Sequence, residues 1–343
     1  MKILVRAPNW IGDSILAIPA MEAVRARWPR AEIVGLSRPG VAEIYAGQPF
    51  VDRVIPLDAG GGLKDFRAME GTAIKLRAER LDSALLLPNS FSSAWLAWRA
   101  GIPERIGYSR DGRGILLTRK IRVPRAGEIP KHESYYYMEL LRRAGWCNEA
   151  PQITQVRLHV SADALQSAED VLKKAGAPPN RPRVALAAGA AYGSAKCWLP
   201  ERFAEVADRL IDDFRASVIL FGTSSERGIT SRIAQCMKQP SINLAGLTNV
   251  ALLPALMARC RLFVGNDSGA MHVAAAIGIP VVAVFGPTDP EGTAPLTPHR
   301  ILVREPVFCS PCFLRTCPID HRCMKRIQAG AVYNAARNWL ERA

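Results

Sequence analysis

The stretch RLFVGNDSGAMHVAAAIGIPVVAVFGPTDP, Arg261–Pro290, decides the fold of this chain. Two apolar runs, predicted as strands over 262–264 and 281–285, flank a run of small residues predicted as a helix over 268–277. Alternation of short apolar strands with helices favours a parallel sheet that is covered by helices on both faces. The polar break Asn266–Gly269 then falls where the strand ends, which is where such sheets bind ligands.

The same alternation extends along the chain on both sides of this stretch. It begins with strand 2–7, helix 11–28 and strand 32–36, continues with strand 82–87 and helix 92–100, and restarts at residue 184. The segment KKAGAPPNRPR, with three prolines and a glycine, reads as a connection between domains. We therefore predict an α/β chain of two Rossmann-like, doubly wound domains facing across a ligand-binding cleft. The predicted parts are a first domain 1–172, a linker 173–183, a second domain 184–325 and a terminal helix within 326–343.

Composition limits the kinds of partner. The chain has 343 residues, of which 49% are hydrophobic and 22% charged, so two globular domains are expected. A net charge of +14 favours an acidic partner such as nucleic acid, an anionic membrane surface or a phosphorylated substrate, although some soluble proteins are simply basic. No run of about 18 apolar residues occurs, so we expect no transmembrane helix. We also expect no secretory leader, a cytoplasmic location and at most peripheral contact with a membrane.

The polar break before the predicted helix 268–277 has the features of an anion site. The first N–H groups of a helix are unpaired and its dipole favours negative charge, while Gly269 allows a ligand close to the backbone. His272 lies about one turn further on and can donate to a phosphate or a ribose hydroxyl. The alternative is a helix capped by Asp267 or Ser268, with His272 satisfied in the protein interior.

Two more strand-to-helix loops belong to the same predicted edge. The loop LAAGAAYGSAKCWLPERF supplies Ser194 and Lys196, and its lysine either neutralises a phosphate or is an ordinary surface lysine. The loop FGTSSERG places Glu226 at a helix start, where it accepts from ribose hydroxyls or stabilises its own helix. Neither a Walker A spacing nor a G-x-G-x-x-G after the first strand is present, which argues against a P-loop enzyme and a dehydrogenase.

In the first domain, the loop APNWIGDSI places Asp13 at the ligand end of the first strand. A carboxylate there can take a proton from an acceptor hydroxyl, or it can help to cap its own helix. Further on, residues 99–125 contain eight basic side chains against Glu104 and Asp111: Arg99, Arg105, Arg110, Arg113, Arg119, Lys120, Arg122 and Arg125. Only one aromatic residue, Tyr108, lies among them, so this rim fits a phosphorylated glycolipid at a membrane at least as well as nucleic acid.

Four of these segments together resemble a known family. NDSGAMHVAAAIGIPVVAVFGPTDP, AAGAAYGSAKCW, APNWIGDS and LLLPNSFSSAWLAWRAGIPERIGY are similar to the ADP-heptose:lipopolysaccharide heptosyltransferases of glycosyltransferase family 9, most of all to the heptosyltransferase II branch. The resemblance implies a GT-B fold with the acceptor in the first domain and the nucleotide-sugar in the second. It also implies inverting transfer of L-glycero-D-manno-heptose from ADP-heptose to an inner-core heptose. The acceptor is then a heptosyl-Kdo2-lipid A type molecule at the cytoplasmic face of the inner membrane, and no nucleic acid takes part.

The resemblance also implies roles for individual residues. Asp13 matches the proposed general base, Lys196 the lysine on the donor phosphates, and Glu226 the contact to the ribose. The remaining donor positions are Ser194, Asp267, Ser268, Gly269 and His272, and we assign the acceptor side to Asn89, Ser90, Arg105, Arg110 and Arg113. The chain departs from many relatives in the run Cys197-Trp198-Leu199-Pro200, which follows Lys196.

The sequence contains no Asp-x-Asp motif, on which many nucleotide-sugar transferases bind a divalent metal, so we expect catalysis without a metal or other cofactor. Three alternatives to the main hypothesis remain at this point. They are a heptosyltransferase with another acceptor, a GT-B sugar-nucleotide epimerase, and a non-catalytic protein that binds an anionic glycolipid.

A separate cluster of cysteines lies near the carboxyl end of the chain. Cys309, Cys312, Cys317 and Cys323 fall within 15 residues, next to His321. Four thiolates can hold a structural Zn²⁺, although common zinc sites are spaced differently and these gaps match neither common iron–sulfur pattern. Free thiols and disulfides formed on oxidation are the alternatives.

Overall fold

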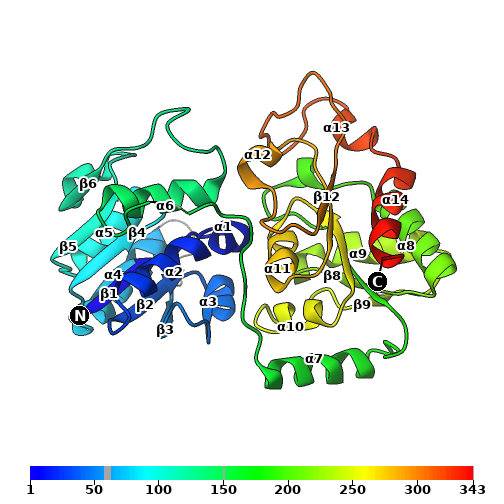
Figure 1. Cartoon of the computed structure of the whole chain (residues 1–343), viewed down its shortest axis with the longest axis horizontal. Helices are drawn as coiled ribbons and strands as arrows, with labels where there is room; N and C mark the ends of the chain where they lie inside the picture. Colours follow the sequence, from blue (N-terminus) through cyan, green and yellow to red (C-terminus); the bar gives the residue numbers. More distant parts are fainter. Residues whose placement is uncertain (58–62, 150, 343) are drawn as a thin grey trace. The chain divides into compact units, whose positions relative to one another are not determined.

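The computed structural model describes residues 1–57, 63–149 and 151–342, with the side chains of 63–66 left out. Within these residues the chain forms two compact units, Met1–Ile153 and a second unit that begins at Thr154. Each unit is built on one parallel sheet, as the alternation of strands and helices predicts (Figure 1).

The sheet of the first unit has the strand order β3-β2-β1-β4-β5-β6. Its strands are β1 (Lys2–Arg6), β2 (Glu32–Ser37), β3 (Arg53–Pro56), β4 (Ser83–Leu86), β5 (Glu104–Tyr108) and β6 (Arg119–Ile121). Its helices are α1 (Ile11–Leu16), α2 (Ile18–Arg27), α3 (Pro39–Tyr45), α4 (Leu63–Ala78), α5 (Phe91–Arg99) and α6 (Glu133–Arg143). In the register, Leu4 of β1 lies opposite Val34 of β2 and Ala84 of β4.

The sheet of the second unit has the order β12-β11-β10-β7-β8-β9. Its strands are β7 (Arg183–Ala187), β8 (Ser217–Phe221), β9 (Ile242–Asn243), β10 (Leu262–Asn266), β11 (Val281–Val284) and β12 (Arg300–Val303). Its helices are α7 (Ala162–Lys174), α8 (Pro200–Phe214), α9 (Arg227–Cys236), α10 (Leu253–Ala258), α11 (Gly269–Ile277), α12 (Pro290–Thr293), α13 (Arg322–Lys325) and α14 (Ala329–Leu340).

Both sheets have the strand order of a Rossmann fold, which reverses direction once. The reversal lies between β1 and β4 in the first unit and between β7 and β10 in the second. At such a reversal the two loops that follow the strands run to opposite faces of the sheet, which leaves space for a ligand at its carboxyl edge. The predicted doubly wound α/β architecture is thus confirmed for each unit.

The cores explain why the strands appear in the sequence as continuous apolar runs. The strands β7, β8 and β10 are buried at every position, since helices cover both faces of the sheet. On one face, α8 and α14 lie side by side and pack Phe203 and Val332 against the sheet (Figure 1). A strand buried on both faces has no polar side, so apolar residues are not interrupted along it.

One helix prediction in the first unit is wrong in its extent. The sequence favours a single helix over 11–28, whereas the structure has α1 and α2 with a break at Ala17. Pro19 explains the break, because proline has no N–H for an intrahelical hydrogen bond and its ring excludes the carbonyl of an earlier turn. The second helix therefore begins afresh, with the proline in its first turn.

The division of the chain lies before the predicted linker 173–183. Thr154 already belongs to the second unit, and α7 is attached to that unit by two hydrogen bonds of 2.7 Å between Arg183 and Glu169. Arg259 adds a hydrogen bond of 3.2 Å from Nε to the carbonyl of Leu165 on α7. The proline-rich segment is therefore the loop between α7 and β7, where prolines prevent either element from continuing.

Candidate functional site

The loops after β7 and β10 form the candidate site of the second unit. These strands pair directly, with Gly265 opposite Ala187, so both chains leave the sheet at the same place. The loop after β7 contains the 3-10 turn η2 (Ser194–Lys196), and the loop after β10 leads into α11. Lys196 and Asp267, which are 71 positions apart in the sequence, are thereby brought into contact.

Lys196 and Asp267 form an ion pair that is largely buried. The Nζ atom of Lys196 lies 2.6 Å from Oδ2 of Asp267, and the two side chains are 13% and 4% exposed. The same oxygen accepts a hydrogen bond of 2.6 Å from Oγ1 of Thr288, and the ring of Tyr192 lies 5.1 Å from Nζ. The alternative of an ordinary surface lysine is wrong, because a buried ammonium needs such partners in place of water.

The start of α11 is open to a ligand. Ser268 is its N-cap residue, and among the described residues its side chain makes no capping hydrogen bond to the helix. The carboxylate of Asp267 is bonded to Lys196 and Thr288, so the capping alternative from the sequence is not what the structure shows. Within the described part of the chain, Oγ of Ser268 is buried and has no hydrogen-bond partner. Open helix amides beside a hydroxyl and an ammonium group are a chemical set that suits a phosphate.

The other predicted donor residues lie around this helix start. Gly269 begins α11, and His272 lies in its first turn with 4% of its side chain exposed. Ser194 begins η2 and is exposed. The structure thus brings the positions of Ser194, Lys196, Asp267, Ser268, Gly269 and His272 to one edge of the sheet, and their contacts to a donor stay a prediction.

Asn266 holds the two loops together, and the sequence analysis missed this role. Its Oδ1 accepts a hydrogen bond of 3.1 Å from the N–H of Trp198, and its Nδ2 donates to the carbonyl of Ala188 at 2.6 Å. The sequence contained a signal for this role, because Asn266 ends an apolar strand and a buried amide there must find hydrogen-bond partners. Trp198 itself is buried against Phe203, so the departure Cys197-Trp198-Leu199-Pro200 fastens the loop to the core.

Glu226 reaches the same edge from the neighbouring strand β8. Its Oε2 accepts hydrogen bonds of 2.8 and 3.0 Å from the backbone N–H and the hydroxyl of Thr223, and the bond from the N–H is one half of a capping box. A Cβ atom at Gly189 would lie only 1.8 Å from Oε1 of Glu226, so the carboxylate packs directly on the loop after β7. Glu226 therefore stabilises its own helix start, as one alternative predicted, and it also lies beside the candidate donor loop.

In the first unit, Asp13 lies in the first turn of α1, after β1. Glu133, in the first turn of α6, is its neighbour: burial raises the pKa of Glu133, and the negative charge of Asp13 raises it further. Tyr137 also lies close by, since the charges of both carboxylates raise the pKa of its hydroxyl in addition to burial. Sequence reasoning missed Glu133, because nothing in the sequence indicates that α6 begins beside α1.

Asn89 and Ser90 follow β4, the strand next to β1. Nδ2 of Asn89 donates to the hydroxyl of Tyr136 at 2.9 Å, and Ser90 caps α5 by accepting from the N–H of Ser93. Arg110 is exposed and lies near Tyr136 and Glu133, since its charge lowers the pKa of both groups against the larger effect of burial. Asn89, Ser90 and Arg110 thus accompany Asp13 at this edge.

The prediction that Arg113 contacts the acceptor directly is wrong for this arrangement, because its side chain is fully buried. Its Nε donates to the carbonyl of Tyr108 at 2.8 Å, and its other nitrogens donate to Pro88, Ser93 and Asn89. Burial lowers the pKa of this guanidinium to about 10. Arg113 therefore positions the loop that carries Asn89 instead of lining a rim.

Arg105 and the wider basic rim also differ from expectation. Arg105 lies near the amino end of β5, and its Nε donates to the carbonyl of Leu116 at 2.7 Å, with further bonds to the carbonyls of Ile102 and Pro103. Four other basic residues of the rim have an acidic partner within 4 Å: Arg99, Arg110, Arg119 and Arg122. Much of the positive charge counted in the sequence is therefore paired.

We expect Arg113→Met to destabilise the first unit by about 2–4 kcal/mol, because it removes several buried hydrogen bonds from one charged donor to carbonyl and hydroxyl oxygens. Thermal or urea unfolding of the full chain measures this effect. Arg110→Met is the matched control, since that side chain is exposed, and it is expected to change the free energy of unfolding by less than about 0.5 kcal/mol. Equal effects of the two substitutions would contradict a special role for Arg113.

The four clustered cysteines lie in the second unit, between β12 and α14. Cys309, Cys312 and Cys317 are half-buried, Cys323 is buried, and all four are free thiols. Across residues 1–57, 63–149 and 151–342, no group of three or more His, Cys, Asp or Glu side chains is arranged to hold a metal ion. The arrangement is that of the free-thiol alternative, and neither the predicted Zn²⁺ site nor a disulfide is formed in it.

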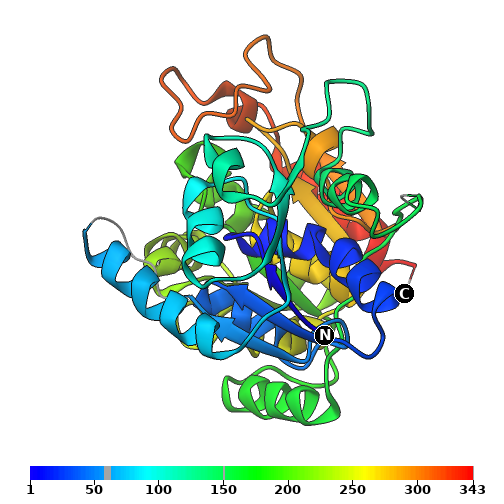
Figure 2. The same cartoon turned by 90° about the vertical axis from the view of Figure 1, so that its left-hand side faces the viewer.

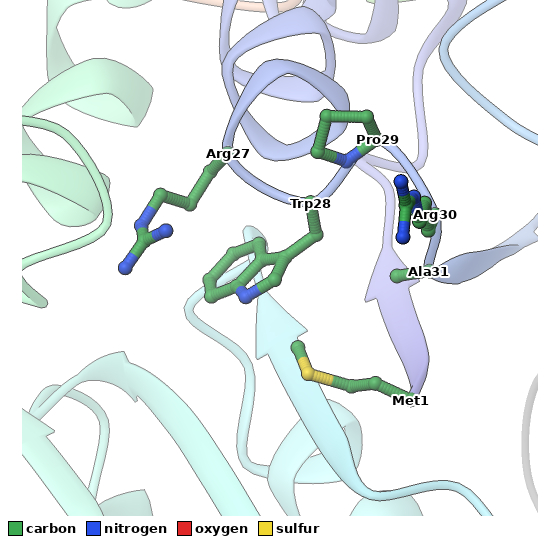
Figure 3. Close-up of a pocket in the computed structure, with 6 residues that line it drawn as sticks. All are labelled: Met1, Arg27, Trp28, Pro29, Arg30 and Ala31. Atoms are coloured by element: carbon green, nitrogen blue, oxygen red, sulfur yellow. The ribbon is translucent and has the colours of Figure 1, made fainter.

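A hollow in the first unit lies away from the residues described above (Figure 3). Met1 and Ala31, which precede β1 and β2, line it together with the segment 27–30 at the end of α2. It is therefore at the amino edge of the sheet, opposite to the loops that carry Asp13 and Asn89. In parallel α/β sheets, ligands bind at the carboxyl edge, so this hollow is not the candidate site.

The second unit has a lysine and the start of α11 at the switch point of a Rossmann-like sheet, which is the arrangement of nucleotide-binding α/β proteins. The sequence matches the family model of glycosyltransferase family 9 (heptosyltransferase) over residues 72–322. This chain therefore belongs to glycosyltransferase family 9, and the resemblance recognised in its sequence motifs is confirmed.

Individual relatives agree with this membership. The chain is 32% identical over 320 residues to lipooligosaccharide heptosyltransferase 2 of Haemophilus ducreyi, covering 89% of this chain and 88% of that protein. It is 31% identical over 310 residues to lipopolysaccharide heptosyltransferase 2 of Escherichia coli, with the same coverage. The solved structure of E. coli ADP-heptose lps heptosyltransferase II superimposes with a TM-score of 0.83 at 29% identity, covering 100% of this chain and 99% of that one.

No helix in the described residues is both long enough and apolar enough to cross a membrane.

Proposed function

We propose that this protein is an inverting heptosyltransferase of the heptosyltransferase II type. It moves L-glycero-D-manno-heptose from ADP-heptose to the inner-core heptose of a heptosyl-Kdo2-lipid A type acceptor. The observation that carries the proposal is the start of α11 next to the largely buried pair of Lys196 and Asp267. At this start the buried hydroxyl of Ser268 has no hydrogen-bond partner among the described residues. Family membership and the names of the relatives support the choice of sugar and acceptor.

The second unit binds the donor in this proposal. The diphosphate lies against the amides of α11 and the hydroxyl of Ser268, with Lys196 supplying positive charge and His272 a further donor. Glu226 accepts from the ribose hydroxyls beside Gly189. As the bond between the sugar and ADP breaks, negative charge grows on the diphosphate, and these fixed donors stabilise it without needing to reorganise.

The first unit supplies the proton acceptor. Inversion in one displacement needs a base on the sugar face opposite the leaving group, and Asp13 takes the proton of the attacking hydroxyl. Glu133, whose pKa is raised by burial and by Asp13, favours its protonated form more than an ordinary glutamate does. Asn89 and Arg110 then orient the acceptor, whose hydroxyl must reach the anomeric carbon of the donor.

A donor screen with a transfer assay tests this function. ADP and ADP-heptose are expected to raise the melting temperature, whereas UDP- and GDP-sugars are not, and heptose is expected to appear on the acceptor only when the acceptor is present. Isomerisation of the donor without acceptor would instead identify an epimerase. Donor or glycolipid binding without any consumption of donor would identify a non-catalytic binder.

We propose a cytoplasmic location with peripheral contact to the inner membrane, because the acceptor in this function is anchored by lipid. A lipid-linked acceptor stays in the bilayer, so the enzyme must work at the membrane surface. The net charge of +14 favours the surface of an anionic leaflet.

Transfer is expected to persist after exhaustive treatment with EDTA. The reason is the missing Asp-x-Asp motif, together with the cationic and amide donors at the start of α11 that can meet the charge of ADP. Initial rates with and without chelator, at equal ionic strength, make the comparison. A loss of activity that Mg²⁺ restores would contradict metal-free transfer.

A further inference from the structure

Exposed apolar side chains are concentrated in the segment between β12 and α13, which we call the 304–321 loop. Of the eleven large apolar side chains that are exposed in the described residues, four lie within the twelve residues 308–319. They are Phe308, Phe313, Leu314 and Ile319, exposed by 84%, 54%, 44% and 57%. Single exposed apolar residues are ordinary on protein surfaces, but a concentration of this kind marks a contact surface.

The 304–321 loop is not loosely attached. The N–H groups of Cys312 and Phe313 donate to the carbonyl of Pro287 at 3.0 and 2.9 Å. The hydroxyl of Ser310 donates to the carbonyl of Gly286 at 2.6 Å. The loop is thus fastened to the chain that follows β11.

A second set of bonds fastens the loop to the segment that carries Lys196. The hydroxyl of Tyr192 donates to the carbonyl of Phe313 at 2.6 Å, and the N–H of Ala195 donates to the carbonyl of Arg315 at 3.0 Å. The backbone of the loop is therefore used for attachment, while its large apolar side chains stay in solvent. The loop follows the carboxyl end of β12 and runs outward next to α12 and α13 (Figures 1 and 2).

Basic residues accompany these apolar side chains in the sequence. Arg304 and Arg315 of the loop, and Lys325 and Arg326 just after it, are exposed. The guanidinium of Arg322 lies 4.7 Å from the centre of the Phe308 ring, so a cation and the most exposed apolar side chain are direct neighbours. Against these five basic residues stand only Glu305 and Asp320 between 304 and 326.

We propose that the 304–321 loop docks the protein on the surface of an anionic lipid bilayer. Aromatic and aliphatic side chains enter the boundary between headgroups and acyl chains, while the flanking arginines and lysines stay with the anionic headgroups. Charge complementarity favours this partner over a second copy of the chain, because the same cations would face each other across a twofold interface. The inference rests on the proposed function in one respect: a lipid-linked acceptor gives the enzyme a reason to bind a bilayer.

Sedimentation of the full chain with vesicles tests the docking surface. The vesicles are a roughly 3:1 mixture of phosphatidylethanolamine and phosphatidylglycerol, with pure phosphatidylcholine as the neutral comparison. The test variant combines Phe308→Ser, Phe313→Asn and Ile319→Ser. Asparagine is used at 313 because this residue has a φ of 55°, in the left-handed region that asparagine tolerates. The matched control is Ile74→Ser, which removes a side chain with 60% exposure from α4.

The wild type is expected to bind the anionic vesicles and to be released as NaCl rises from about 0.1 to about 0.5 M. The triple variant is expected to bind at least about tenfold more weakly, and Ile74→Ser to bind like the wild type. Both variants should keep their thermal shift with ADP and their transfer to an acceptor in detergent. If the triple variant melts early, Phe308→Ser alone replaces it, since that side chain is the most exposed of the four.

Two results would overturn the proposal. The first is unchanged vesicle binding by a folded triple variant. The second is a change in its oligomeric state in sedimentation velocity while vesicle binding stays intact, because that would identify a second copy as the occupant. Wild-type protein that binds vesicles but transfers no heptose in detergent would count against the proposed function and support the docking surface.

Discussion

Asp13→Ala is expected to lower the rate of heptose transfer by two or more orders of magnitude, in line with general-base contributions of about 10²–10⁴. Its affinity for ADP should change by less than about twofold, because Asp13 lies in the first unit and the candidate donor residues in the second. Single-turnover kinetics with saturating donor measure the first effect, and calorimetry with ADP measures the second.

Two further variants separate catalysis from structure at this position. Asp13→Asn keeps the shape and any capping contact of the side chain but removes the base, so it should be as inactive as Asp13→Ala. Glu133→Gln removes the neighbouring carboxyl charge and should leave most of the transfer activity. An active Asp13→Asn enzyme, or an equal loss of ADP binding in Asp13→Ala, would show that Asp13 has a structural role.

Lys196→Ala is expected to destabilise the second unit by about 3–5 kcal/mol and to weaken donor binding at the same time. The loss of stability follows from burial, since the carboxyl group of Asp267 is 4% exposed and would lose its ammonium partner. The hydroxyl of Thr288 would remain as a partner of that carboxylate. Urea unfolding and the thermal shift with ADP measure the two effects separately.

A double-mutant cycle isolates the ion pair itself. Asp267→Asn removes the buried charge, so the double variant Lys196→Met with Asp267→Asn should be clearly more stable than Lys196→Met alone. Donor binding should not recover in the double variant, because the positive charge for the diphosphate is still missing. Additive effects on stability would contradict a coupled pair, and full donor affinity in Lys196→Met would leave the lysine without a donor role.

The strands and most ligand-edge loops of the second unit could be predicted from the sequence. The strand predicted over 262–264 is β10, which extends two residues further, and the strand predicted over 281–285 is one residue longer than β11. These predictions succeed because a parallel strand buried on both faces must be a continuous apolar run, and because small or polar residues mark its end. The prediction of a single helix over 11–28 was wrong, because Pro19 lies in the first turn of a second helix.

The candidate site was predicted by position but not by contact. The loops that carry Lys196 and Asp267 were recognised from their residues, yet the two side chains are 71 positions apart, and only the pairing of β7 with β10 joins them. The role of Arg113 was misjudged for the same reason. A charged residue in a sequence is expected to be exposed, whereas this guanidinium is buried and donates to the carbonyls of Pro88 and Tyr108.

The sequence by itself determined the class of this protein, because local patterns of apolar residues, glycines and loop motifs specify alternating strands and helices and the family to which they belong. The tertiary structure alone decided the partners of the polar side chains: Asp267 for Lys196, and backbone carbonyls for Arg113. The physical reason is that burial and strand order are long-range properties. A charged or polar group removed from water takes whichever partner the packing brings to it, and nothing in its neighbouring residues records which partner that is.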